Sequence, residues 1–465
     1  MLLTEIAALN GTQGVPGGTR RIPITTKVGW AFGSAGSTTV LYVVNVILMY
    51  YLVTATGMDP ALAGSFMLAG RIYDGIADLL IGQGSDRTRS RWGRRRPWMA
   101  AGALLSGLGM AWLFSGSGAG GSQAVMVMGA LLLTFTGYSA FAIPSSAMPA
   151  EITDSPQERT SLMAWRTFFI QLAALAGGAL APAMIAWGGS SADAFARMGY
   201  CMAAFIFVSM AVAVVATGGL REHPVEHERG SALAGFAQLF ANRPFIVLLG
   251  VKFCGFIASA AVGATGLFFM RDVLARGETG MAQFALASGV VGTMSVPVWR
   301  QIARFAPKPV ICAAALVLSA AISLSWLAAS PAEGDALFLL RGGFAGFATT
   351  GTLLMTLSML PDTIAFGVRR SGLRKEGLYA AFFEFFQKAA FALAPFLVGL
   401  FLQASGYRSG TGAALVQSEA AREAVRLSMA LIPAVAQVAG IVLLLFYRMP
   451  AENLAEPAPA PHEEN

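Results

Sequence analysis

Twelve long apolar stretches dominate this chain of 465 residues. Hydrophobic residues make up 55% of the chain and charged residues only 12%, whereas a soluble domain carries about 25% charged residues. Because roughly 20 apolar residues cross a bilayer as one helix, the chain is long enough for twelve spans with loops between them. These features exclude a soluble enzyme and predict an all-α membrane protein with twelve transmembrane helices.

Glycine, proline or charged residues bound each apolar stretch, so the limits of the spans can be predicted. The predicted spans are 28–54, 60–85, 97–115, 123–149, 160–187, 195–218, 244–270, 281–304, 308–328, 335–361, 376–404 and 423–447. The longest polar insert between spans divides them into six and six. The predicted domains are an N-terminal six-helix bundle with the cation site (1–219), a cytoplasmic central loop (220–243), a C-terminal six-helix bundle (244–447) and a cytoplasmic tail (448–465).

The two halves share a weak internal repeat. The fourth span ends in Met148-Pro149-Ala150-Glu151, and the tenth ends in Met359-Leu360-Pro361-Asp362. Many transporters are built from two such repeats. Proline and acidic residues are also common at the ends of apolar helices, so the repeat alone leaves coincidence as an alternative.

Basic residues indicate the orientation of the chain in the membrane. Loops on the face of the N-terminus hold 21 Lys and Arg residues, and loops on the other face hold 6. The positive-inside rule therefore places both termini in the cytoplasm. The net charge of +7 is explained by these loops, so we expect no nucleic-acid partner. Residues Met1 to Thr25 lack the apolar core of a signal peptide, and we expect the first span to be retained.

Apart from charged residues within a few positions of the span ends, eight charged residues remain inside the predicted spans. An ionisable side chain at membrane depth costs roughly 2.5–3.5 kcal/mol, so such groups should face a cavity and pair with one another. The eight are Arg71, Asp74, Asp78, Arg166, Lys252, Arg341, Glu384 and Lys388.

The second span places Arg71, Asp74 and Asp78 on one helix face, at i, i+3 and i+7. Two carboxylates one turn apart repel each other unless a cation lies between them. A cation such as Na⁺ needs several oxygen ligands; alternatively, one carboxyl group is protonated. Both arrangements predict coupling to a cation. A static network that only holds helices together is the alternative.

A short loop with six arginines follows the second span. A basic loop by itself only fixes topology. Asp86 at the end of the helix, then Arg87, Gly93 and Arg94, predict in addition a charged latch between helices that opens during gating, together with Arg71.

These residues resemble the glycoside–pentoside–hexuronide:cation symporter family. The resemblance rests on Arg71-x-x-Asp74-x-x-x-Asp78, Gly82-x-x-x-Asp86-Arg87-Thr88-Arg89-Ser90-Arg91-Trp92-Gly93 and Pro97-Trp98. It continues in Ile143-Pro144, Glu158-Arg159, Trp165-Arg166-Thr167-Phe168-Phe169, Arg374-Lys375-Glu376-Gly377-Leu378, Phe386-Gln387-Lys388 and Gly406-Tyr407.

The resemblance implies a major facilitator fold of two six-helix bundles around a central cavity. It also implies a monomeric carrier in the bacterial inner membrane that couples uptake of a small solute to Na⁺, H⁺ or Li⁺, with no catalytic residue and no cofactor. By position, Asp74, Asp78 and Ser139 match the family's cation ligands. Arg166 and Lys388 match the basic residues that face these carboxylates. Tyr138, next to Ser139, and Trp165, next to Arg166, are predicted with them to bind the solute or couple it to the ion.

Departures from the family's pattern bear on the solute. Galactoside carriers of the family have two acids and a stacking aromatic where this chain has Gly36, Ala142 and Ser146, so galactosides should bind poorly. Lys252 and Arg341 either bind an anionic group of the solute or extend toward the membrane surface. Glu384 is an additional acid whose expected partner is Lys388 at i+4.

The same residues leave other functions open. Sodium-dependent lysophospholipid symporters resemble this chain in the carboxylates of the second span and the lysine of the eleventh, and also lack the sugar-binding acids. A proton-coupled efflux carrier would fit the Phe-rich stretch from Phe382 to Phe386. An intramembrane enzyme is disfavoured because no His or Cys accompanies the acids at depth, and a mere scaffold would not need paired buried carboxylates.

Overall fold

The computed structural model describes residues 22–116, 121–153, 155–218, 239–371, 376–410 and 416–448. Most of the predicted central loop and nearly all of the predicted C-terminal tail lie outside these residues, as do Arg374 and Lys375. The described part is helical throughout, as the composition predicts. In a bilayer a helix satisfies every backbone hydrogen bond within its own segment, so an apolar run of this length has no competing structure.

Six helical spans form the first half of the chain. They are α2 with η1 and α3 (Ile24–Tyr42, Val43–Leu48, Met49–Thr54), α4 (Pro60–Arg87), α5 (Arg96–Leu113), α6 (Gly121–Ile152), α7 with η2 and α8 (Pro156–Leu175, Ala176–Leu180, Ala181–Trp187), and α9 (Ala192–Ala216).

Six more spans form the second half. They are α11 (Arg243–Asp272), α12 (Gly277–Ile302), α13 with η3 (Lys308–Ser325, Trp326–Ala328), α14 (Asp335–Ser371), α15 (Glu376–Ala404) and α16 (Glu419–Leu445). The predicted spans agree with these helices to within a few residues at most ends. The tenth span is the exception, because α14 continues ten residues past Pro361. A proline inside a membrane helix is tolerated where its surroundings satisfy the freed backbone groups.

Ten of these twelve helical segments are apolar enough to cross a membrane by length and composition alone. The remaining two are α4 and α5. Helix α4 contains Arg71, Asp74 and Asp78 within its length, and α5 begins at Arg96. The helix that departs most clearly from an ordinary membrane span is therefore the one that carries the predicted cation site.

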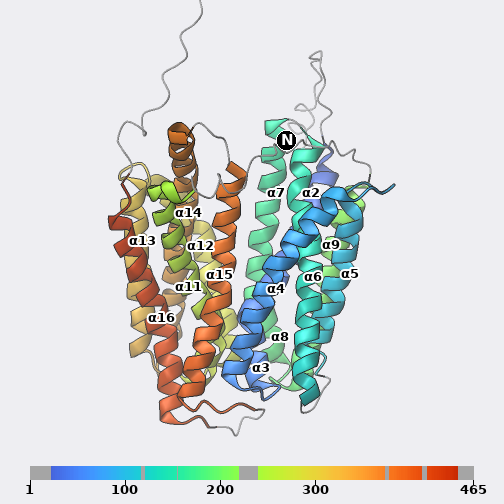
Figure 1. Ribbon diagram of the computed structural model, residues 1–465. Helices are drawn as coiled ribbons and strands as arrows, with labels where there is room; N and C mark the ends of the chain where they lie inside the picture. The colour runs from blue at the N-terminus through green and yellow to red at the C-terminus, as the bar shows by residue number, and fades with distance from the viewer. Residues whose placement is uncertain are drawn as a thin grey trace, which may run out of the picture.

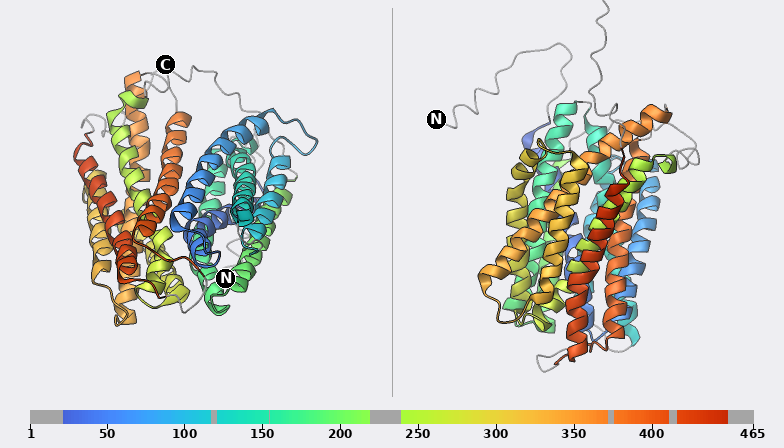
Figure 2. Two further views of the ribbon diagram at one scale, coloured as in Figure 1. Left: turned by 60° about the horizontal axis from the view of Figure 1, so that its bottom comes forward. Right: turned by 90° about the vertical axis from the view of Figure 1, so that its left-hand side faces the viewer.

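The two halves repeat one packing scheme. In the first half α2 packs on α7 and α9, α5 packs on α6 and α9, and α4 packs on α6. In the second half α11 packs on α15 and α16, α13 packs on α14 and α16, and α12 packs on α14. Figures 1 and 2 show the resulting two groups of helices side by side. Each half thus uses the same arrangement of six helices.

The internal repeat in the sequence has a counterpart in the structure. Glu151 near the end of α6 pairs with Arg94 and Arg95, which directly precede α5, 2.6–2.7 Å away. Asp362 on α14 pairs with Lys308, the first residue of α13, at 2.6 Å. Both acids lie just after a proline of their helix, so the two ion pairs occupy corresponding places in the two halves.

The halves contact each other through α4 against α15 and through α8 and η2 against α12. Hydrogen bonds between described residues join the halves in two groups. The first group lies at the end of the molecule opposite the first residues of α2. There, Glu278 accepts from Tyr50 at 2.8 Å and from Ser190 at 2.6 Å, and the backbone N–H of Gly410 donates to Val53 at 3.1 Å. The other group joins Lys388 to α4 at mid-helix. Described residues thus join the halves at one face and at mid-depth.

Glycines allow α4 and α15 to approach closely. A Cβ on Gly64 would lie 2.9 Å from the carbonyl oxygen of Pro395, and one on Gly399 would collide with that of Pro60. Without side chains at these positions the two backbones come into contact. This approach keeps the charged face of α4 within reach of α15.

We predict that Gly399→Ala destabilises the protein, because the added Cβ must push α4 and α15 apart. Overpacking of this kind costs about 1–3 kcal/mol. Gly75→Ala on α4 is the matched control, since a Cβ there meets nothing within 4 Å. Thermal unfolding of both purified variants measures the difference; equal melting temperatures would show that the close approach does not matter.

Candidate functional site

The lysine of α15 reaches both aspartates of α4. Lys388 donates to Oδ2 of Asp74 at 2.8 Å and also to Oδ2 of Asp78. Ser139 on α6 donates to Oδ1 of Asp74 at 3.0 Å, and the side chain of Asp74 is fully buried. The structure therefore brings together Asp74, Asp78, Ser139 and Lys388 from three helices and both halves.

Arg71 completes this cluster from the same helix. Its guanidinium lies 3.6 Å from Oδ2 of Asp74, donates to Oδ1 of Asn45 at 2.6 Å and lies over the ring of Phe135. Asn45 belongs to the π-helical segment η1 inside the first span. Such segments are rare and often occur at functional sites. We find Arg71 inside the charge cluster and not in the loop latch with which the sequence grouped it.

The charges in this cluster balance, and one carboxylate oxygen is left over. Asp74 and Asp78 face Arg71 and the ammonium of Lys388. The buried Oδ1 of Asp78 has no hydrogen-bond partner. A buried carboxylate oxygen without a partner is costly. With Ser139 and Asp74 nearby, it leaves a set of oxygen atoms of the kind that a hard cation prefers.

Arg166 does not share this arrangement. Among the described residues it forms no ion pair with either aspartate, whereas the resemblance implied that it faces them. The ring of Tyr138 lies 5.8 Å from Nζ of Lys388, while Trp165 packs on Phe168 and Phe169. The structure thus does not include Arg166 in the ion pairs of the carboxylate cluster, which are formed by Arg71 and Lys388.

Glu384 pairs with Lys252, not with Lys388 as the sequence predicted. Its Oε1 lies 3.5 Å from Nζ of Lys252, and its side chain is 65% exposed. Lys252 is buried; it also donates to the carbonyl of Phe383 at 2.6 Å and lies against the rings of Phe383 and Phe256. The prediction failed because the aspartates of α4, on another segment of the chain, attract Lys388 more strongly than one acid on its own helix.

Arg341 takes the second of the two expected roles, because its side chain extends toward the connection at the start of α14. It pairs with Glu333 in the connection between α13 and α14, and its guanidinium lies over the ring of Trp326. Arg276 donates to the carbonyl of Glu333 at 2.7 Å in the same place. Arg341 therefore stabilises the end of the second half and does not face the cavity between the halves.

The arginine-rich loop forms a latch, although a different arginine closes it. Arg95 pairs with Asp86 at 2.6 Å and with Glu151 at 2.7 Å, and donates to Ser85 at 2.7 Å. Arg94 pairs with Glu151 at 2.6 Å, not with Asp86. Gly93 has a φ of +94° in the turn before them, a conformation that favours glycine.

The remaining member of the predicted latch, Arg87, is exposed at the end of α4. Arg95 and Glu151 were not predicted, because the spacing of six arginines in one loop does not show which of them pairs with an acid. Only the fold brings the end of α6 to this loop.

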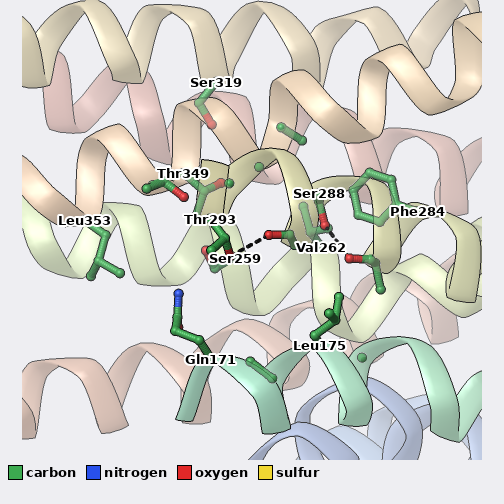
Figure 3. Close-up of a pocket in the computed structure, with 18 of the residues that line it drawn as sticks. Gln171, Leu175, Ser259, Val262, Phe284, Ser288, Thr293, Ser319, Thr349 and Leu353 are labelled. Atoms are coloured by element: carbon green, nitrogen blue, oxygen red, sulfur yellow. Dashed lines mark hydrogen bonds between the residues drawn. The ribbon is translucent and has the colours of Figure 1, made fainter. Parts of the chain in front are cut away.

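A cavity of about 500 Å³ lies between the halves. Figure 3 shows Gln171 and Leu175 of α7 on one side, facing Ser259, Ser288, Thr293 and Thr349 of the second half. Deeper in the second half, the amide of Gln437 donates to Ser319 at 2.6 Å and accepts from Ser323 at 3.3 Å. The lining is apolar surface with hydroxyl and amide groups at intervals, and no carboxylate contributes to it among the described residues.

The resemblance implied a central cavity, but the polar residues that line it were not predicted, because only charged residues were singled out in the sequence. Serine and threonine are common in membrane helices, so no single hydroxyl distinguishes itself in the sequence. The spacing of Ser259 and Lys252 on α11, two turns apart, is the one signal that relates the cavity to a charged residue. Lys252 and Ser259 also line a second cavity of about 90 Å³, to which Thr352 and Thr356 contribute.

Comparison with known proteins places these observations in a family. The family model described as MFS/sugar transport protein matches residues 29–451. A glucuronide carrier protein homologue of Escherichia coli K12 is 26% identical, over 93% of this chain and 94% of its own. An isoprimeverose transporter of Lactiplantibacillus pentosus is 24% identical, over 87% and 85% of the two chains.

Solved structures show the same fold. A crystal structure of a bacterial homologue of the human lysosomal transporter Spinster, in an inward-facing and unoccupied conformation, superposes with a TM-score of 0.67. The two chains are 12% identical, and the match covers 94% of this chain and 98% of the other. At this identity the likeness establishes the twelve-helix fold, and the family follows from the sequence match.

We predict that Glu151→Gln lowers stability far more than Asp86→Asn. Glu151 and Arg95 are both buried, with side chains 3% and 4% exposed, and removing one partner of a buried pair costs about 3–5 kcal/mol. Asp86 is 50% exposed, and pairs with an exposed partner contribute about 0–1 kcal/mol. Thermal unfolding compares the two amides; an equal or larger loss in Asp86→Asn would contradict the assignment.

Proposed function

This chain belongs to the MFS/sugar transport protein family, and from that premise we propose that it couples transport of a glycoside or acidic sugar to Na⁺. The single observation that carries this proposal is the place of Lys388. Its ammonium lies between the two aspartates of α4, which is where the predicted cation would bind. The lysine thus stands in for the ion in the cation-free carrier.

A Na⁺ ion and the lysine exclude each other by charge. With Lys388 in place, two carboxylates face two cations, Arg71 and Lys388. If Na⁺ binds Asp74, Asp78 and Ser139, the balance is kept only when the ammonium leaves. Both states are neutral, whereas holding both cations or neither would leave a net charge at membrane depth, which is expensive.

This exchange would change the connection between the halves. Lys388 on α15 belongs to the second half and its aspartates to the first, so the ion pair is a bridge between halves. Na⁺ bound to α4 and α6 would lie within the first half alone and would remove the bridge. Binding of the ion would then shift the equilibrium between conformations of the carrier, as alternating access requires.

The cavity between the halves is suited to the solute. Its volume of about 500 Å³ lies within the range of small-molecule sites. Hydroxyl and amide groups of Gln171, Ser259, Thr349 and Gln437 can both donate and accept hydrogen bonds, which is what sugar hydroxyls require. This lining supports a glycoside more than a lysolipid, whose acyl chain would leave these polar groups without partners.

We predict that Asp74→Asn and Asp78→Asn each abolish Na⁺-driven accumulation of solute, because each amide removes a charged ligand of the ion. Both proteins should still insert, since a neutral amide costs less in the membrane than a carboxylate. The check is Na⁺-dependent thermal stabilisation of the purified protein at constant pH and ionic strength. The wild type should be stabilised by NaCl relative to choline chloride, and both variants should not be. Equal stabilisation of all three proteins would remove the coupling proposal.

We predict that the solute offers an acceptor group and that melibiose binds poorly. Gly36, Ala142 and Ser146 supply no carboxylate and no aromatic face in the first half, and the charged residues left near the cavity are mainly donors. In a thermal-shift series with Na⁺ present, phenyl β-D-glucuronide should stabilise the protein and melibiose should not. Stabilisation by melibiose alone would show that the missing acids do not decide specificity.

A further inference from the structure

Glu384 lies between two lysines that belong to different parts of the site. It is on α15, one turn before Lys388, and its present partner is Lys252 on α11, 3.5 Å away. Lys388 is meanwhile held by Asp74 and Asp78 on α4. One carboxylate therefore has two possible ammonium partners, and in this structure only one of the two is available to it.

The geometry allows Glu384 to change partners. Its side chain is 65% exposed, so no packing holds it in one rotamer. Glutamate four residues before lysine on a helix is the favourable order for a side-chain pair. When Lys388 loses the aspartates, Glu384 is the acid on its own helix that it can reach.

Lys252, in contrast, is fixed. Its side chain is 3% exposed, and its ammonium is held by the carbonyl of Phe383 and by the rings of Phe383 and Phe256. An ammonium offers three donors, and the Phe383 carbonyl takes only one. If Glu384 moves away, Lys252 stays in place as a buried cation whose counter-charge is missing, a state that strongly favours an anion.

We propose that Lys252 is the binding site for an anionic group of the solute and that Glu384 occupies this site until Na⁺ binds. Sodium at Asp74 and Asp78 releases Lys388, Glu384 turns to Lys388, and the carboxylate, sulfate or phosphate of the solute takes its place beside Lys252. This inference rests on the proposed function and specifies how the ion prepares the site for the solute. No bond is formed or broken; one carboxylate changes partners.

The position of Lys252 fits this role. It lines the cavity of about 90 Å³ together with Ser259, Thr349 and Gln437, and these three also line the larger cavity between the halves. A sugar in the larger cavity could therefore direct its acidic group toward α11.

The test is a double-mutant cycle on Na⁺ affinity, measured by thermal shift of the purified full chain without any solute. Lys252→Gln should strengthen Na⁺ binding by about threefold to fivefold, because Glu384 is then free to receive Lys388 and no buried cation loses its partner. Glu384→Gln by itself should change Na⁺ affinity less than this, because it removes both the gain at Lys388 and the loss at Lys252. In the double variant Lys252→Gln should have no further effect. Simple long-range electrostatics would instead make the two effects additive, and additivity would overturn the proposal.

A second arm tests the anion directly with phenyl β-D-glucuronide and the neutral phenyl β-D-glucoside. In the wild type Na⁺ should strengthen binding of the glucuronide, and in Glu384→Gln the glucuronide should bind equally well with and without Na⁺. Binding of the glucoside should not depend on residue 384. If the glucuronide does not bind the wild type, or if its binding to Glu384→Gln still requires Na⁺, then Lys252 is not an anion site that Glu384 occupies in the absence of Na⁺.

Two controls separate this inference from the proposed function. Glu423→Gln removes a similarly exposed carboxylate from α16, where its partner is Arg426 at 3.7 Å, and it should change neither measurement. Asp74→Asn should abolish Na⁺ binding altogether. If Na⁺ binds the wild type and not Asp74→Asn while the cycle is additive, the coupling site stands and the exchange of Glu384 is wrong. If Na⁺ does not bind the wild type, the proposed function fails as well.

Discussion

Burial of Asp74 at the centre of a membrane helix is the constraint on which the rest of the site depends. A fully buried carboxylate in an apolar medium needs a cation and hydrogen bonds. In this structure Arg71, Ser139 and Lys388 supply them from two halves of the protein. Placing the lysine there requires α4 and α15 to approach closely, and Gly64 and Gly399 allow this approach.

The same constraint connects the ion to the conformation of the carrier. Because one of the cations around Asp74 comes from α15, replacing it changes how the halves are joined. The second group of contacts between described residues of the two halves lies around Glu278 and Tyr50 at one face. In the proposed mechanism the ion removes the bridge at mid-depth and leaves the contacts at one face, an arrangement in which a small ligand can bias a large movement.

The charges of the two halves are used differently. In the first half they lie in the aspartate pair and in the latch of Arg95, Asp86 and Glu151. In the second half Lys252 and Glu384 lie beside a cavity lined by hydroxyl and amide groups. The two halves share their packing scheme, and yet the carboxylates of the proposed ion site belong to the first half, whereas the proposed anion site beside Lys252 belongs to the second. The two repeats therefore share a backbone arrangement, and they differ in which charged side chains they carry.

Composition and patterning determined the class of this protein, the places of its twelve spans and the pair of aspartates on one face of α4. These follow from local rules, because a helix in a bilayer is fixed by its own length and apolarity and its faces by a 3.6-residue period. Which charges meet was decided by the tertiary structure. Glu384 was expected to take Lys388 and takes Lys252, Arg94 was expected at Asp86 and Arg95 is there, and Arg166 does not reach the aspartates. Partner choice among buried charges depends on which helices are neighbours and how closely they approach, and no spacing within one helix contains that information.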